Sequence, residues 1–181
     1  MEKKYDKRLI AADMLEEAIN KFKTATSDLD YIQSILLAGA SIGITNPLLS
    51  ENQKQTAHEK SAETVIRIRE YGLGRELSPQ ERKDVFSGTM RFNKQAYNSL
   101  KHAGKGKQLA ASDDLDIETD FAVEAEELLW AAIEDFNGLP ISPEFLIENG
   151  KNDFRLLIGS SDPLGTIPEM HCKPRSNTKQ Q

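Results

Sequence analysis

The sequence predicts an all-α protein, a bundle of about five main helices followed by one short helix. Apolar residues recur at helical spacing, capping signals precede several of these segments, and glycine or proline follows them. No segment shows the convincing alternation of a strand. The 181 residues fit one domain. We expect a helical domain over residues 1–150 and a flexible polar extension over residues 151–181.

The first two helices are predicted over residues 5–25 and 28–46. The first carries an apolar stripe that includes Phe22, with charged side chains on its other faces. The second has few polar faces, and small residues around Gly39 would let neighbouring helices approach closely, so we expect it at the centre of the bundle. It is predicted to end before Pro47, because the residue preceding a proline disfavours the helical conformation.

The third and fourth helices each begin at a predicted capping box. Residues 50–53 are predicted to open the third helix, which runs to about Tyr71 before two glycines. Residues 78–81 open the fourth, with a proline at its first position, and it is predicted to extend to about Ala103. The glycine- and aspartate-containing stretch that follows, residues 104–116, is predicted to be a loop.

A fifth helix is predicted over residues 117–137, and a short last one begins after Ser142 and runs through Asn149. Trp130 is interpreted as a bundle residue of the fifth helix. The acidic side chains of this helix are interpreted as a solvated face, and the second interpretation is a surface for a basic protein partner. These acidic residues are Glu124, Glu126, Glu127, Glu134 and Asp135.

Composition restricts the possible functions. The formal charge of −6 argues against a protein that coats nucleic acid through its overall field. Cys172 is the single cysteine, no zinc-ligand spacing is present, and His58 is interpreted as a packed or surface side chain. The apolar stretch 31–44 is too short to span a bilayer, and no signal-peptide run follows Met1. We therefore expect a cytoplasmic protein with no metal, no cofactor and no membrane contact.

A polar stripe is predicted along the fourth helix, whose residues each step by about 100°. Arg91, Lys94, Asn98 and His102 fall on one side, and Lys101 lies at its margin. The simplest interpretation is a solvated face. The opposite arc holds the predicted core residues Val85, Thr89, Phe92, Ala96, Leu100 and Ala103.

The polar stripe could also carry out phosphodiester chemistry. The imidazole of His102 could take a proton from a ribose 2′-hydroxyl, which would then attack the adjacent phosphate. Asn98 could orient the imidazole or the phosphate. Lys101, Lys94 and Arg91 could stabilise negative charge on the phosphoryl oxygens, and this chemistry needs no metal ion.

Four segments of the chain resemble the HEPN superfamily, the higher eukaryotes and prokaryotes nucleotide-binding domains. Asn98-Ser99-Leu100-Lys101-His102-Ala103 is similar to the Asn-x-x-Lys-His-Ala signature of bacterial members. Ser34-Ile35-Leu36-Leu37-Ala38-Gly39-Ala40 is similar to their small-residue helix. Asp116-Ile117-Glu118 and Leu128-Leu129-Trp130-Ala131-Ala132 are similar to the acidic turn and packing helix that follow. The resemblance covers roughly residues 5–150.

The resemblance implies a helical bundle that forms a homodimer, with the motif in a cleft between subunits. It also implies a metal-independent endoribonuclease or RNA-binding protein of a toxin–antitoxin or antiviral defence system. The family's catalytic motif begins with an arginine, and Tyr97 stands at that position here. Tyrosine supplies no permanent positive charge, so His102 and Asn98 alone match the catalytic pattern. The alternative is an inactive dimerisation or adaptor module that binds a protein partner.

Overall fold

The computed structural model describes residues 2–102 and 116–151, and all regular secondary structure in these two stretches is helical. The predicted all-α bundle is therefore confirmed. The helices are α1 (Lys7–Lys23), α2 (Asp28–Glu51), α3 (Ala57–Leu73), α4 (Pro79–Phe92), α5 (Gln95–Lys101), α6 (Phe121–Gly138) and α7 (Pro143–Glu148).

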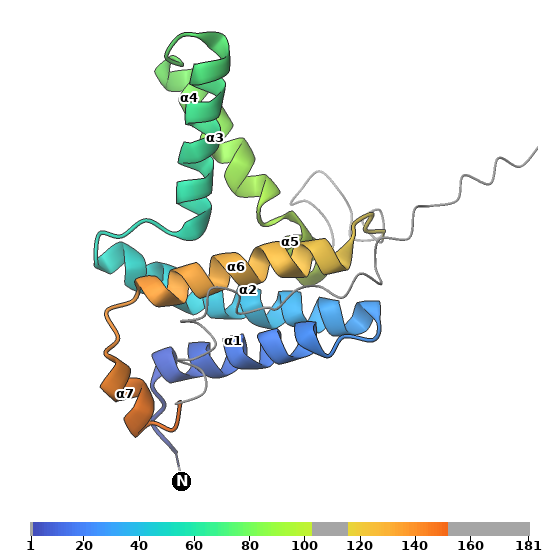
Figure 1. Cartoon of the computed structure of the whole chain (residues 1–181), viewed down its shortest axis with the longest axis vertical. Coiled ribbons are helices and arrows are strands. Elements are labelled where there is room, and N and C mark those ends of the chain that lie inside the picture. Colours follow the sequence, from blue (N-terminus) through green and yellow to red (C-terminus); the bar gives the residue numbers. More distant parts are fainter. Residues whose placement is uncertain (1, 103–115, 152–181) are drawn as a thin grey trace, which may run out of the picture.

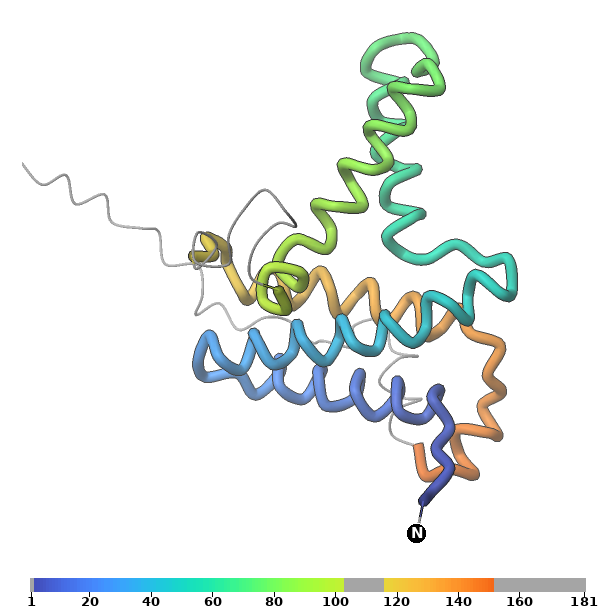
Figure 2. The backbone as a smooth tube through the Cα atoms, turned by 180° about the vertical axis from the view of Figure 1, so that it is seen from behind, coloured from blue at the N-terminus to red at the C-terminus, as the bar shows by residue number. Residues whose placement is uncertain are grey.

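Three long helices, α1, α2 and α6, pack against one another and form the body of the bundle (Figure 1). The helices α3 and α4 pair with each other and rise from this body as a hairpin, which is also seen from behind (Figure 2). The short α5 follows the hairpin and packs on α2. The main apolar core lies in the body, whereas Ile66, Leu77 and Val85 form a second, smaller core within the hairpin.

Small residues and two buried serines join α1 to α2. The Ser34 hydroxyl donates to the carbonyl of Ala18 at 2.9 Å, and the Ser41 hydroxyl donates to the carbonyl of Ala11 at 3.0 Å. Both serines and both alanines are fully buried. Because each buried hydroxyl finds an acceptor on the neighbouring helix, these polar groups carry no desolvation penalty and hold the two helices in register.

Side-chain caps fix the N-termini of several helices. The Asp6 carboxylate accepts from the Arg8 backbone N–H at 2.8 Å, and the Asp120 carboxylate accepts from the first turn of α6. Ser78 and Glu81 form the predicted capping box of α4, and Ser142 caps α7 as predicted. These caps satisfy backbone donors that have no partner inside the helix.

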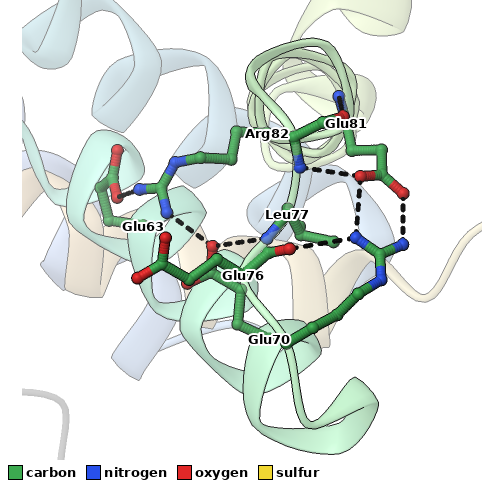
Figure 3. A network of polar contacts seen from close by, with 8 residues as sticks. Glu63, Glu70, Glu76, Leu77, Glu81 and Arg82 are labelled. Atoms are coloured by element: carbon green, nitrogen blue, oxygen red, sulfur yellow. Dashed lines mark hydrogen bonds and ion pairs between the residues drawn. The ribbon is translucent and has the colours of Figure 1, made fainter.

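Ion pairs tie together the end of the hairpin where α3 passes into α4 (Figure 3). Arg82 bridges Glu63 at 3.2 Å and Glu70 at 2.7 Å, and the Glu70 carboxylate also accepts from the Leu77 backbone N–H at 3.1 Å. Glu81 pairs with Arg75 at 2.7 Å. A network of this kind fixes geometry more than an isolated surface pair does.

The predicted end of the second helix is wrong. The helix α2 continues through Pro47 to Glu51, and the predicted capping box at residues 50–53 is instead its C-terminal end. Proline removes one N–H and leaves the carbonyl of Gly43 without its helical partner. Both Gly43 and Pro47 are exposed, so water can satisfy that carbonyl. The next helix starts later, at a capping box formed by Thr56 and Glu59.

With its 24 residues, α2 is long and apolar enough to cross a membrane by length and composition. The predicted limit of the apolar stretch, residues 31–44, was too short because the helix passes Pro47. In the fold, α2 is the central helix, and its buried residues contact α1, α5 and α6.

The predicted fourth helix is interrupted at Asn93 and Lys94, which separate α4 from α5. The Asn93 side-chain amide donates to the Ser61 hydroxyl of α3 at 3.3 Å, and asparagine is a weak helix former. Because the axis changes at this break, the stripe does not continue along one straight helix. Phe92, predicted in the core, is 68% exposed, whereas Val85 and Ala96 are buried as predicted.

Substitution of two glycines on α2 tests the close approach of α5. A Cβ at Gly39 would come within 2.8 Å of Tyr97 Cγ and overlap its ring, whereas a Cβ at Gly43 would meet nothing within 4 Å. We expect Gly39→Ala to lower the free energy of unfolding by about 2 kcal/mol through overpacking. Gly43→Ala, the matched control, should raise it by up to about 1 kcal/mol through helix propensity. Urea unfolding measures both, and equal effects would contradict the tight contact.

Candidate functional site

A groove of about 1280 Å³ lies where α3, α4 and α5 come together over α6. One wall is formed by the hairpin and the other by α6. Ala96 and Tyr97 of α5 and Ile35 of α2 also contribute to its lining. Among the described residues, the groove therefore draws on most of the helices of the fold.

Large apolar side chains in this groove remain open to solvent. Phe92 is 68% exposed, Leu73 is 56% exposed and Trp130 is 41% exposed. Trp130, interpreted from the sequence as a bundle residue, belongs to α6 and lines the groove with its side chain partly open to solvent. Exposed apolar side chains that line a concave surface are typical of a binding site.

Carboxylates outnumber cations on the described groove surface. Glu134 pairs with Lys60 at 2.7 Å, and Glu81 belongs to the hairpin network. Asp84, Glu124 and Glu127 form no ion pair with another described residue. The charged residues of the lining are Arg69, Glu81, Asp84, Glu124, Glu127 and Glu134.

Asp135 is not part of a solvated face, in contrast to the prediction from the sequence. It is 1% exposed, and its Oδ1 accepts a hydrogen bond of 2.6 Å from the backbone N–H of Ala57, the first residue of α3. Its Oδ2 is buried without a partner in the described structure. Burial raises the pKa of Asp135 to about 6, although the bond from Ala57 opposes the shift.

His58 follows Ala57, the donor of this hydrogen bond, and lines the groove. It is 5% exposed, and its Nδ1 has no hydrogen-bond partner within the part of the chain that the structure describes. Burial lowers the pKa of His58 to about 4, and the nearby charge of Lys94 acts in the same direction. The imidazole is therefore neutral near pH 7, and the interpretation of His58 as a packed side chain agrees with its burial.

The structure places three of the predicted site residues together at the end of α5. Asn98, Lys101 and His102 are all exposed, and the His102 backbone N–H donates to the Asn98 carbonyl at 3.0 Å. The Lys101 ammonium lies 5.5 Å from the centre of the Tyr97 ring, within the range of a cation–π contact. These three side chains lie on the solvent side of the bundle.

Tyr97, which stands where the resemblance requires an arginine, is directed into the fold. Its ring packs against Gly39 of α2 so closely that no Cβ would fit there. Tyr97 therefore fills a packing position between α5 and α2, and this structural role was not visible in the sequence.

The other two predicted residues belong to different surroundings. Arg91 is exposed in the last turn of α4, before the break in the helix axis. Lys94 is half-buried at the N-terminus of α5, and its charge acts on both His58 and Asp135. The five predicted residues thus separate into an exposed group on α5, one arginine on the hairpin, and one lysine near the buried side chains of His58 and Asp135.

No group of three histidine, cysteine, aspartate or glutamate side chains is placed to hold a metal ion in residues 2–102 and 116–151. The predicted loop at residues 104–116 lies outside the described residues except for Asp116, as does the predicted extension except for Lys151.

Comparison of the chain with protein-family models, with curated proteins and with solved structures gives no match.

The two buried groups give the stability opposite dependences on pH. The pKa of His58 falls from 6.5 to about 4 on folding, so the unfolded chain binds more protons and stability rises with pH across this interval. The pKa of Asp135 rises from 3.8 to about 6 on folding, so the folded chain binds more protons and stability falls with pH across it.

We expect single variants to reveal each dependence between pH 4 and pH 6.5. Relative to the wild type, Asp135→Asn should make stability rise more steeply with pH, and His58→Gln should make it fall, each by on the order of 2 kcal/mol across the interval. Urea midpoints measured at successive pH values give these slopes. Parallel curves for all three proteins would contradict the assigned shifts.

Proposed function

We propose that this chain is a HEPN-like helical adaptor module, located in the cytoplasm, that binds a protein partner through the groove between the α3–α4 hairpin and α6. One observation carries the proposal: the groove exposes Phe92, Leu73 and Trp130 in a concave surface. Exposed aromatic and aliphatic side chains of this kind are typical anchors of protein interfaces.

The arrangement of α5 supports an adaptor over a nuclease. Tyr97 occupies the motif arginine position and packs on Gly39, so it supplies no cation to a phosphate. Arg91 lies beyond the break in the helix, on the hairpin. The resemblance of Asn98 to Ala103 supports a partner from a toxin–antitoxin or antiviral defence complex, and a homodimer belongs to the same proposal.

Two exposed apolar residues of the hairpin provide a matched test of the groove. Phe92 lines the groove and is 68% exposed, whereas Ile68 is 65% exposed and does not line it. We expect helical peptides selected against the whole protein from a displayed library to lose about tenfold or more in affinity for Phe92→Ser, because an interface anchor is removed. Ile68→Ser should bind them as the wild type does.

Two outcomes of this selection would contradict the proposal. Either no helical peptide binds the folded protein above background, or the selected peptides bind the Phe92→Ser and Ile68→Ser variants with equal affinity. The second result would place their site outside the groove. Circular dichroism of both variants verifies that the helical fold is intact before affinities are compared.

The second candidate function is RNA binding or metal-independent RNA cleavage by the exposed end of α5. The observation that favours it is that Asn98, Lys101 and His102 are exposed together there. An imidazole next to a lysine in the sequence is suited to activating a ribose 2′-hydroxyl, while the lysine stabilises the phosphate. In this hypothesis, His102 and Asn98 are the catalytic residues, and Lys101, Lys94 and Arg91 contact phosphates.

This second function predicts RNA cleavage that depends on His102. The wild type, incubated with a mixed pool of structured and single-stranded RNA in EDTA, should produce fragments with cyclic-phosphate ends. His102→Ala should reduce the rate by at least about 100-fold, because the general base is lost. Cleavage that is unchanged in His102→Ala would exclude this site, and Asn20→Ala on the distant α1 serves as the control variant.

A further inference from the structure

The groove between the hairpin and α6 is larger than most small-molecule sites. Its volume of about 1280 Å³ exceeds the range of roughly 300–1,000 Å³ in which most small-molecule sites fall. Its walls are helices, the α3–α4 hairpin and α6, as in other sites where an amphipathic helix lies in a groove.

The side chains of the groove select the chemistry of that helix. Trp130 and Phe92 offer an apolar surface, and both are exposed. Beside Trp130 on α6, Glu124 and Glu127 line the groove without an ion pair to any described residue, and Asp84 does the same on α4. An occupant that covers the apolar surface also brings its outer edges against these carboxylates.

We propose that the groove binds a basic amphipathic helix of a partner protein, with its apolar face on Trp130 and Phe92 and its lysine or arginine side chains against Glu124 and Glu127. The inference rests on the proposed function, whose binding site it uses, and adds the chemical class of the partner. The cations of such a helix would complement the carboxylates of Asp84, Glu124 and Glu127, called here the acidic rim, and would orient the helix as it docks.

The same charges argue against the other occupants. RNA phosphates would meet a rim of carboxylates and be repelled. A second copy of this chain carries the same formal charge of −6, and like charges would oppose its approach to this groove. The acidic rim therefore favours a basic helix over both RNA and a second copy of this chain.

Trp130 makes the test direct, because it is the only tryptophan of the chain and lies in the groove. Its emission is followed during titration with a tryptophan-free amphipathic helical peptide of leucine and lysine, about 18 residues long to favour helix formation. Two matched peptides replace every lysine by glutamine or by glutamate. We expect the lysine peptide to shift the emission and to bind at least about tenfold more tightly than the glutamine peptide, with the glutamate peptide weakest.

A pair of double variants separates the groove from general charge attraction. Glu124→Gln with Glu127→Gln should weaken the lysine peptide about tenfold or more. Glu17→Gln with Glu51→Gln removes the same charge at exposed positions outside the groove and should change the affinity less than about twofold. Equal weakening in both double variants would show general attraction and overturn the proposal.

The peptides also separate this inference from the proposed function. If all three peptides shift Trp130 emission with equal affinity, the groove binds helices, and the basic partner is wrong. If none of them shifts it, both the basic partner and the use of the groove as a docking site are overturned. Concentration-dependent association of the protein alone, with a matching change in Trp130 emission, would identify a second copy as the occupant and overturn the inference.

Discussion

The position of the hairpin depends on one buried hydrogen bond, from the Ala57 backbone N–H to the carboxylate of Asp135. Ala57 is the first residue of α3, where backbone donors lack helical partners and the helix dipole favours a negative group. The same bond joins the start of α3 to the last turn of α6. The exposed ion pair of Lys60 with Glu134 joins the same two helices, whereas the bond from Ala57 to Asp135 is buried. This attachment requires the Asp135 carboxyl to be buried, and burial raises its pKa.

A second constraint acts on the other side of α2. Gly39 and the small residues near it let the ring of Tyr97 lie against the helix backbone, and this contact sets the position of α5. The end of α5 is therefore held by packing, while Asn98 and His102 remain open to solvent. At the position where the HEPN resemblance would place an arginine, Tyr97 therefore makes a helix–helix contact.

Local signals in the sequence were sufficient for the helical class and for several helix starts. Ser78 with Pro79 and Ser142 with Pro143 begin helices as predicted, because capping and proline geometry act within one turn. The continuation through Pro47 and the break after Phe92 could not be read in the same way. The first depends on exposure of a freed carbonyl, and the second coincides with a hydrogen bond between Asn93 and Ser61 on a neighbouring helix.

The candidate site, too, could be predicted from the sequence only in part. The acidic row on α6 was recognisable as a surface that could meet a basic partner, since its residues are close in sequence. The wall of the groove opposite this row could not be recognised, because the hairpin reaches α6 only through tertiary contacts. For the same reason, Asp135 was grouped with exposed glutamates although it is buried, and the position of Trp130 in the groove could not be predicted.

The separate small core of the hairpin has a consequence for cooperativity. Ile66, Leu77 and Val85 give α3 and α4 only a limited apolar attachment, while the body has the larger core. Elements of this kind open in local events that require less free energy than global unfolding. An occupant held between hairpin and α6 would suppress those openings, so the amide protons of α3 and α4 would report on occupancy even where they touch no ligand.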